Sequence, residues 1–126
     1  MIRIAVVEDD EDYIAVIKKY IVRYMKEKGD TISVDVFQDG NQIVFDYQPV
    51  YDIILMDIRM PHMTGHEAAR AIRETDHPDA LSIPIIAMSA DAFSDDIQRC
   101  LKSGMNAHIA KPIDILELTQ LLKKYL

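Results

Sequence analysis

The chain has 126 residues, 49% hydrophobic and 28% charged, which is the balance of one soluble domain with its own core. Its net charge of −7 has the wrong sign for a surface that binds nucleic acid or an anionic membrane. The length predicts a single domain over residues 1–126. We expect it in the cytoplasm, because the chain has one cysteine and neither a membrane-length apolar stretch nor a secretory signal.

The first quarter of the chain predicts a strand, a helix and a second strand. Residues 2–7 are an apolar run, and Asp10 is the predicted N-cap of a helix that runs to about Lys28 and stops at Gly29. Residues 32–37 alternate apolar and polar side chains, which is typical of an exposed edge strand. The apolar stripe of the predicted helix consists of Ile14, Ile17, Ile21 and Tyr24.

The middle of the chain repeats this alternation. Residues 39–47 predict a short, weaker helix, and residues 53–56 an apolar third strand. Thr64 and Glu67 have the spacing of a capping box, which predicts a helix from there to about Thr75. Residues 84–88 predict a fourth strand, since proline is tolerated at the first position of a strand.

The last third of the chain adds two helices and a strand. Ser94 is the predicted cap of a helix that ends near Ser103 and Gly104. Residues 106–110 predict a short strand of small residues, and Asp114 is the predicted cap of a final helix. The inner stripe of that helix consists of Leu118, Leu121, Leu122 and Tyr125.

Five strand–helix units in succession predict an α/β fold with a doubly wound parallel sheet. Crossovers between parallel strands are right-handed, and a five-unit open sheet favours helices on both faces. The second and fifth strands look like edges, which supports the flavodoxin-like, three-layer (βα)5 arrangement with strand order 2-1-3-4-5. That order places the first and third strands side by side, so their carboxyl ends should meet in one crevice.

Notable side chains follow four of the five predicted strands, namely Glu8 with Asp9, Asp57, Ser89 and Lys111. Each alone has a plain structural explanation as a helix cap, a turn residue, a backbone-bonding hydroxyl or a surface charge. Their joint position at the carboxyl edge favours a functional explanation. Three carboxylates that share a crevice repel one another unless a cation enters, and oxygen ligands suit Mg²⁺.

This pattern predicts phosphoryl-transfer chemistry at Asp57. With Mg²⁺ held by Glu8 and Asp9, directly or through water, Asp57 can accept a phosphoryl group as an acyl phosphate. Lys111 and the Ser89 hydroxyl can stabilise the charge on the phosphoryl oxygens. The acidic stretch after the first strand replaces the glycine loop that cradles phosphates, which counts against dinucleotide, flavin and Walker-type binding.

At these residues the whole chain resembles the receiver domain of two-component response regulators. The resemblance implies that Asp57 accepts a phosphoryl group from a phosphohistidine of a sensor histidine kinase or a histidine phosphotransfer protein. The segments that carry it are Val6-Val7-Glu8-Asp9-Asp10, Leu55-Met56-Asp57-Ile58-Arg59-Met60-Pro61 with Gly65, Met88-Ser89-Ala90, and Gly104-Met105-Asn106-Ala107-His108-Ile109-Ala110-Lys111-Pro112.

The resemblance also implies a metal site and a switch. It implies that Mg²⁺ or Mn²⁺ is bound by Asp9, Asp57 and the backbone carbonyl of Arg59, with Glu8 reaching the metal through water. Ser89 is then the switch hydroxyl and Lys111 the phosphate-binding lysine. The bond between Lys111 and Pro112 is expected to be cis, a minority state that tertiary structure must hold.

Three positions invite a separate interpretation. The family often has tyrosine or phenylalanine three residues before the lysine, where this chain has His108. One reading is that His108 fills the same aromatic slot; the other is that its protonation near neutral pH biases the switch. Arg59 and Asp91 stand two residues after Asp57 and Ser89, where the family tunes phosphoryl lifetime. They either pair across the site or remain two solvated charges.

The expected function is a phosphorylation-controlled signalling switch rather than an enzyme, with only self-phosphorylation and slow autodephosphorylation. The expected readout surface is the fourth helix, fifth strand and fifth helix, through which a homodimer can also form. Two alternatives are a phosphate-independent receiver-like interaction module and a Mg²⁺-dependent aspartyl phosphohydrolase. The first half of the chain looks like receivers that precede DNA-binding domains, and its last part like receivers of hybrid kinases.

Overall fold

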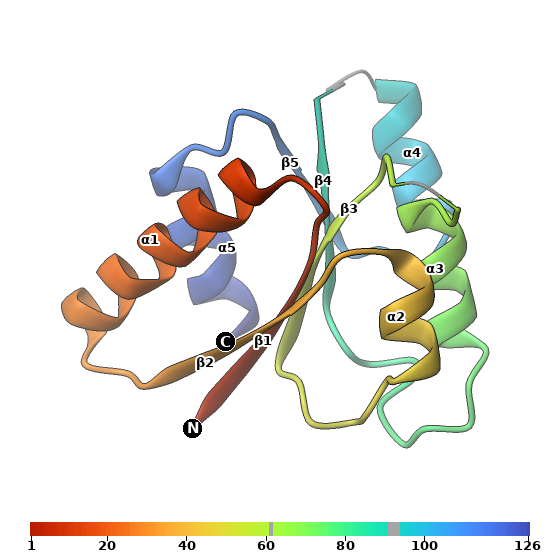
Figure 1. Ribbon diagram of the computed structural model, residues 1–126, viewed down its shortest axis with the longest axis horizontal. Helices are drawn as coiled ribbons and strands as arrows, with labels where there is room; N and C mark the ends of the chain where they lie inside the picture. The colour runs from red at the N-terminus through yellow and green to blue at the C-terminus, as the bar shows by residue number, and fades with distance from the viewer. Residues whose placement is uncertain (61, 91–93) are drawn as a thin grey trace.

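The computed structural model describes residues 1–60, 62–90 and 94–126, with only the backbone of residues 94–96. Strands and helices alternate along the chain, and the described strands form one parallel sheet in the order β2-β1-β3-β4-β5, which confirms the predicted topology (Figure 1). The elements are β1 (Ile2–Val7), α1 (Glu11–Lys28), β2 (Ile32–Phe37), α2 (Gly40–Phe45), β3 (Ile53–Asp57), α3 (Gly65–Arg73), β4 (Ile85–Ser89), α4 (Ser94–Lys102), β5 (Ala107–Ala110) and α5 (Ile115–Tyr125).

Helices cover both faces of the sheet, with α1 and α5 on one face and α2, α3 and α4 on the other (Figure 1). Successive strand residues therefore enter different cores. In β1, Ile4 and Val6 pack with the α1–α5 side, whereas Ala5 and Val7 pack with the α2–α3–α4 side. Burial on both faces explains why the central strands read as continuous apolar runs.

The helix ends follow the predicted capping residues. The Asp10 side chain accepts a hydrogen bond from the Asp12 backbone N–H, and Gly29 closes α1 in the left-handed conformation at φ 74°. Thr64 and Glu67 form the predicted capping box, and Asp114 caps α5. The stripe of α1 is buried as expected; in α5 Leu118 and Leu122 are buried, while Leu121 and Tyr125 are partly buried.

Several predicted boundaries were off by one to two residues. The helix predicted over 39–47 spans Gly40–Phe45, and α3 ends at Arg73 rather than near Thr75. The fourth strand begins at Ile85 and β5 at Ala107, because Asn106 bridges them: its N–H donates to the Ile85 carbonyl and its side-chain oxygen accepts from the Ile85 N–H. Ser94 is the first residue of α4, and the residues just before it lie outside those described.

The register of the sheet brings the strand ends together. Val7 pairs with Met56 and Ser89 with Ala110, so the residues that follow β1 and β5 stand level with the ends of β3 and β4. The Lys111 N–H then donates to the Ser89 carbonyl at 2.9 Å. In the described part of the chain, no helix has the length and apolar character needed to cross a membrane.

Candidate functional site

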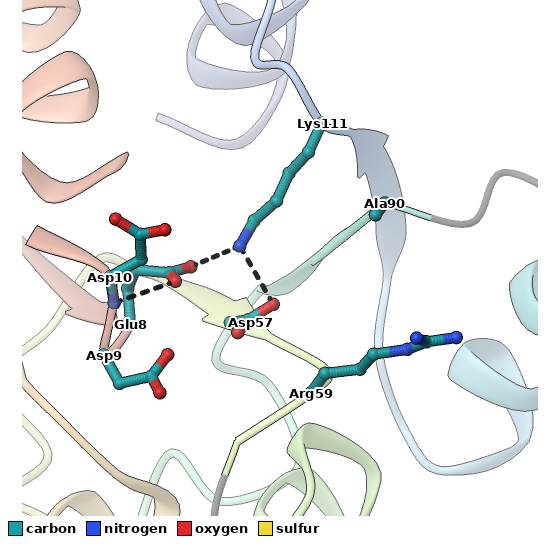
Figure 2. Close-up of a pocket in the computed structure, with 7 residues that line it drawn as sticks. All are labelled: Glu8, Asp9, Asp10, Asp57, Arg59, Ala90 and Lys111. Atoms are coloured by element: carbon teal, nitrogen blue, oxygen red, sulfur yellow. Dashed lines mark hydrogen bonds and ion pairs between the residues drawn. The ribbon is translucent and has the colours of Figure 1, made fainter. Parts of the chain in front are cut away.

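Glu8, Asp9 and Asp57 converge at the carboxyl edge of the sheet. One carboxylate oxygen of each lies within 4.8 Å of those of the other two. Asp57 and Glu8 are buried, with 4% and 0% of their surface exposed, while Asp9 is exposed at the mouth of the pocket. Figure 2 shows the three acids from the ends of β1 and β3 around one side of this pocket. The predicted acidic crevice is therefore present.

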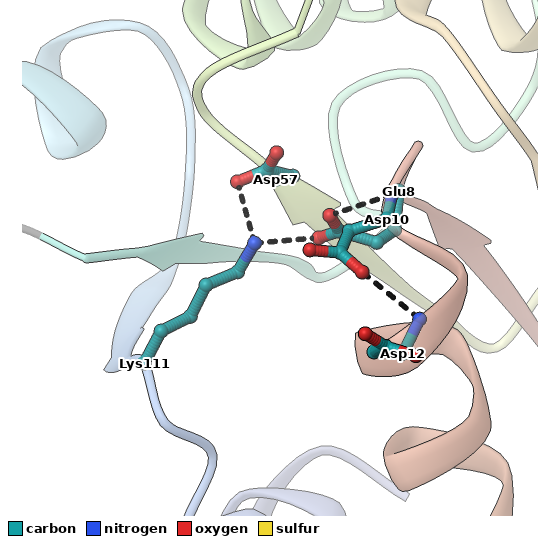
Figure 3. Close-up of polar contacts among 5 residues, drawn as sticks. All are labelled: Glu8, Asp10, Asp12, Asp57 and Lys111. Carbon is teal, nitrogen blue, oxygen red and sulfur yellow. Dashed lines mark hydrogen bonds and ion pairs between the residues drawn. The ribbon is translucent and has the colours of Figure 1, made fainter.

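Lys111 reaches from the end of β5 into the middle of this crevice. Its Nζ lies 2.8 Å from Glu8 Oε2 and 3.2 Å from Asp57 Oδ1, with only 9% of the side chain exposed (Figure 3). The lysine predicted to bind phosphate is thus already held beside the predicted acceptor. A cation this close to Asp57 is placed to contact an oxygen of any group attached to that carboxylate.

Both oxygens of Glu8 are engaged by the protein itself. Oε2 accepts from Lys111, and Oε1 accepts from the Asp10 backbone N–H at 3.3 Å. The Asp10 side chain is occupied as well, because it caps α1 as expected. The water-mediated metal role that the resemblance implied for Glu8 stays a prediction.

Burial controls the protonation of the site. Burial, with a smaller contribution from the charge of Asp9, raises the pKa of Asp57 above its ordinary 3.8, although the adjacent Lys111 ammonium lowers it. Burial likewise raises the pKa of Glu8 above 4.5, despite the hydrogen bond from Lys111. Burial lowers the pKa of Lys111, but the hydrogen bond to Glu8 and the charge of Asp57 outweigh it, so the pKa is raised overall. Both acids therefore lie where their charged forms are less favoured than in water.

The residues present fit a divalent cation. Three carboxylates carry three negative charges and Lys111 one positive charge, which leaves two negative charges at the site. The donors are oxygens alone, the ligand type that Mg²⁺ and Mn²⁺ prefer. The pocket that holds them is lined by Glu8, Asp9, Asp10, Asp57, Arg59, Ala90 and Lys111.

The structure places Arg59 at the rim of the pocket. Its backbone N–H hydrogen-bonds the Asp57 carboxylate, and its side chain extends away from the acids in Figure 2. Gly65 packs directly against the backbone of residues 57 and 58, and its N–H donates a hydrogen bond to the Ile58 carbonyl at 2.8 Å. A Cβ added at Gly65 would meet the Asp57 carbonyl oxygen and lie 2.9 Å from Ile58 Cα. Only a residue without a side chain allows so close an approach.

Of the remaining predicted residues, Ser89 lies next to the pocket and His108 lies on the neighbouring strand. Ser89 is the last residue of β4 and is 3% exposed, while Ala90, one residue further, lines the pocket. His108 lies in β5 and pairs with Ala87 of β4. Its buried Nε2 has no hydrogen-bond partner among the described residues. The bond between Lys111 and Pro112 is cis, as expected. Asp91 lies outside the described residues, so its predicted pairing with Arg59 stays a prediction.

Sequence reasoning missed Tyr13. Its ring, in the first turn of α1, lies 4.3 Å from Lys111 Nζ, measured to the ring centroid. Nothing in the residue spacing links a helix tyrosine to a lysine at the far end of the chain. The aromatic residue shortly after the acidic stretch was the one available signal, because the start of α1 must lie at the same sheet edge as the acids.

The comparisons with known proteins agree with this geometry. The sequence signature of the response regulator receiver domain matches residues 4–123. The two-component response regulator ORR41 of Oryza sativa subsp. japonica is 34% identical over 129 residues, covering 99% of this chain and 94% of that protein. Histidine kinase 1 of Arabidopsis thaliana is 52% identical over 64 residues, covering 51% of this chain; that match spans only 5% of the kinase.

A solved structure of similar sequence shares the fold. It is the receiver domain of the sensor histidine kinase PA1611 from Pseudomonas aeruginosa PAO1, crystallised with a magnesium ion coordinated in its active-site cleft. It is 34% identical with a TM-score of 0.81, and the match covers 98% of this chain and 95% of that one. The sequence match, the parallel sheet and the acidic cleft agree: the chain belongs to the response regulator receiver domain family, a module of two-component signalling.

Proposed function

We propose that Asp57 is the phosphoacceptor of a two-component phosphorelay. The observation that carries this proposal is the position of Lys111 between Asp57 and Glu8, two members of the acidic cluster that also includes Asp9. An Asp57 oxygen attacks the phosphorus of a phosphohistidine on a sensor histidine kinase or a histidine phosphotransfer protein. The O–P bond of an acyl phosphate forms as the P–N bond breaks, and the electron pair returns to the imidazole of the donor.

The site supports a Mg²⁺ or Mn²⁺ requirement. Asp9, Asp57 and the backbone carbonyl of Arg59 are the proposed ligands, with Glu8 contributing through water. When bound, the ion supplies positive charge that offsets the charge of the phosphoryl oxygens. Lys111 then meets one phosphoryl oxygen, and the Ser89 hydroxyl turns toward another. The cation coordinated in the cleft of the similar PA1611 receiver supports this assignment.

Phosphorylation is proposed to act through a two-state switch. Ser89 and His108 face the same side of neighbouring strands, because Ala87 pairs with His108 and the side chains of Ala87 and Ser89 share a face. Movement of both would alter the surface formed by α4, β5 and α5, through which a partner or a second copy binds. Arg59 and Asp91 are the proposed determinants of phosphoryl lifetime.

Two other functions are less well supported. A phosphate-independent interaction module would have no use for a lysine held against the acceptor, yet Lys111 and Asp57 form a buried pair. An aspartyl phosphohydrolase would need a substrate cavity beyond the acceptor, whereas the pocket at Asp57 is lined mainly by the charged cluster itself. We therefore propose a signalling module with self-phosphorylation and slow autodephosphorylation as its only chemistry.

The test uses a small phosphodonor. Incubation with acetyl phosphate and Mg²⁺, followed by intact mass measurement, should show one phosphoryl group on the wild type and none on Asp57→Asn. Asp30→Asn, the same chemical change on an exposed loop, is the matched control and should behave as wild type. Modification of Asp57→Asn, or steady turnover of the donor without a stable phosphorylated form, would contradict the proposal.

A further inference from the structure

Tyr13 closes one side of the Lys111 binding position. The ammonium group has Glu8 Oε2 at 2.8 Å, Asp57 Oδ1 at 3.2 Å and the Tyr13 ring centroid at 4.3 Å. Tyr13 comes from α1, Lys111 from the end of β5, and the two acids from the ends of β1 and β3. The Lys111 ammonium is thus contacted by three side chains from two distant parts of the chain, residues 8–13 and Asp57.

The ring itself is held in place. Tyr13 is partly buried and packs against the core cluster on the α1–α5 face of the sheet. The ring therefore rests on apolar side chains and presents a face to the ammonium group. A cation over an aromatic face is attracted to its electrons, and this attraction grows as water is excluded. The Lys111 side chain is only 9% exposed, so little water competes for its cation.

The restraint matters because lysine is a poor positioning device by itself. Its ammonium group ends a flexible four-carbon stem with three equivalent donors and no fixed direction. The two carboxylates attract it, but one of them, Asp57, must also take up the phosphoryl group. A ring that does not change during transfer can hold the ammonium near Asp57 throughout.

We propose that Tyr13 is a positioning residue for phosphoryl transfer, acting through Lys111. Its aromatic face keeps the ammonium where it meets a phosphoryl oxygen on Asp57. The inference rests on the proposed phosphoacceptor function and adds a residue to it. The ring face, not the hydroxyl, performs the task, so phenylalanine should replace tyrosine while an aliphatic side chain should not.

The experiment compares three variants in the full chain. Tyr13→Phe keeps the ring, and Tyr13→Leu removes it. Tyr125→Leu is the matched control, since Tyr125 also packs on the α1–α5 core and lies beside a lysine, Lys124, outside the site. The rate of phosphorylation by acetyl phosphate with Mg²⁺ should fall roughly three- to thirty-fold in Tyr13→Leu, the range of a single cation–aromatic contact. Tyr13→Phe and Tyr125→Leu should stay close to wild type.

A second readout reports the contact directly. Protons held over an aromatic face shift upfield in NMR, so the Lys111 ε-methylene signals should be upfield in wild type and Tyr13→Phe. They should move toward ordinary lysine values in Tyr13→Leu. A general loss of structure in Tyr13→Leu would also move these signals toward ordinary lysine values, so circular dichroism melting first establishes that this variant is folded. Should Tyr13→Leu not fold, Tyr13→Met provides a flexible replacement without a ring, and the wild-type shift remains measurable.

The outcomes separate the two proposals. If wild type is phosphorylated at Asp57 but Tyr13→Leu reacts at the same rate, the role of Tyr13 is refuted and the phosphoacceptor function stands. Lys111 signals without an upfield shift in wild type would also refute it. If wild type is not phosphorylated, the proposed function itself fails and this inference falls with it.

Discussion

Lys111 Nζ lies 2.8 Å from Glu8 Oε2, and both side chains are almost excluded from solvent. The two residues come from opposite ends of the chain, so this pair joins β1 to the segment after β5. Glu8 therefore has a role beside any metal: it anchors the lysine that also contacts Asp57 at 3.2 Å. The acceptor, the lysine and the anchor form one electrostatic unit, in which a change at one member alters the others.

The first prediction concerns stability without divalent cations. Lys111→Met should lower the free energy of unfolding by roughly 3 kcal/mol, because it leaves buried carboxylates without a compensating charge. Asp57→Asn should raise it, since that change removes one of the mutually repelling buried acids. Urea unfolding in the presence of a chelator measures both. Equal destabilisation by the two variants would contradict the electrostatic explanation.

The second prediction concerns pH and metal affinity. The pKa values of Asp57 and Glu8 are raised above 3.8 and 4.5, so protons compete with Mg²⁺ at a higher pH than for ordinary acids. Mg²⁺ affinity, measured by calorimetry, should have fallen to half of its plateau value at a pH above the ordinary values of 3.8 and 4.5. A midpoint at or below 3.8 would contradict the raised pKa values.

The same shifts set the pH dependence of folding. A carboxyl group with a raised pKa in the folded state binds more protons folded than unfolded, so without metal its contribution to stability falls as pH rises through that window. The stability advantage of Asp57→Asn over wild type should therefore grow with pH above 3.8 and then level off. An advantage that shrinks with rising pH would reverse the assigned direction.

A third prediction tests the close approach of Gly65. Gly65→Ala places a Cβ against the Asp57 carbonyl and 2.9 Å from Ile58 Cα, and backbone atoms cannot move aside easily. It should cost about 1–3 kcal/mol of stability and weaken Mg²⁺ binding, because the Arg59 segment must shift. Gly29→Ala is the contrast: it strains a φ of 74° in open space and should cost stability without affecting metal binding.

A fourth prediction concerns His108 Nε2, which is buried and has no hydrogen-bond partner in the part of the chain that the structure describes. A buried polar atom without a hydrogen bond costs about 1–3 kcal/mol. His108→Phe keeps an aromatic ring and removes that cost, so it should raise the melting temperature of the unphosphorylated protein by a few degrees. If the melting temperature falls, the nitrogen is satisfied by bound water and contributes to this state. The same variant tests whether the histidine ring biases the switch. If it does, the affinity of His108→Phe for beryllofluoride, which mimics a phosphoryl group on aspartate, should differ from that of wild type.

The sequence predicts much of this architecture because continuous apolar runs and capping residues act locally. Asp10, Gly29 and the Thr64 capping box mark their helix ends directly, and the edge character of two strands supports the order of the sheet. Convergence of Glu8, Asp9 and Asp57 then follows from the register alone.

Other features depend on contacts between distant segments. The start of β4 is set by the side chain of Asn106, and Tyr13 meets Lys111 only after the sheet is complete. Neither contact has a signal in residue spacing. The specific roles of Ser89, His108 and the Arg59 carbonyl came from the resemblance to receiver domains, since a strand-end position alone fits a structural role equally well.

The most direct test of the central claim is to locate the phosphoryl group chemically. After reaction with acetyl phosphate and Mg²⁺, borohydride reduces an aspartyl phosphate to homoserine, which peptide mass mapping can place on the chain. The phosphoacceptor role of Asp57 predicts homoserine at position 57 alone, lost when Mg²⁺ is chelated before the reaction. Homoserine at position 9, or a phosphoryl group that borohydride does not remove, would contradict it.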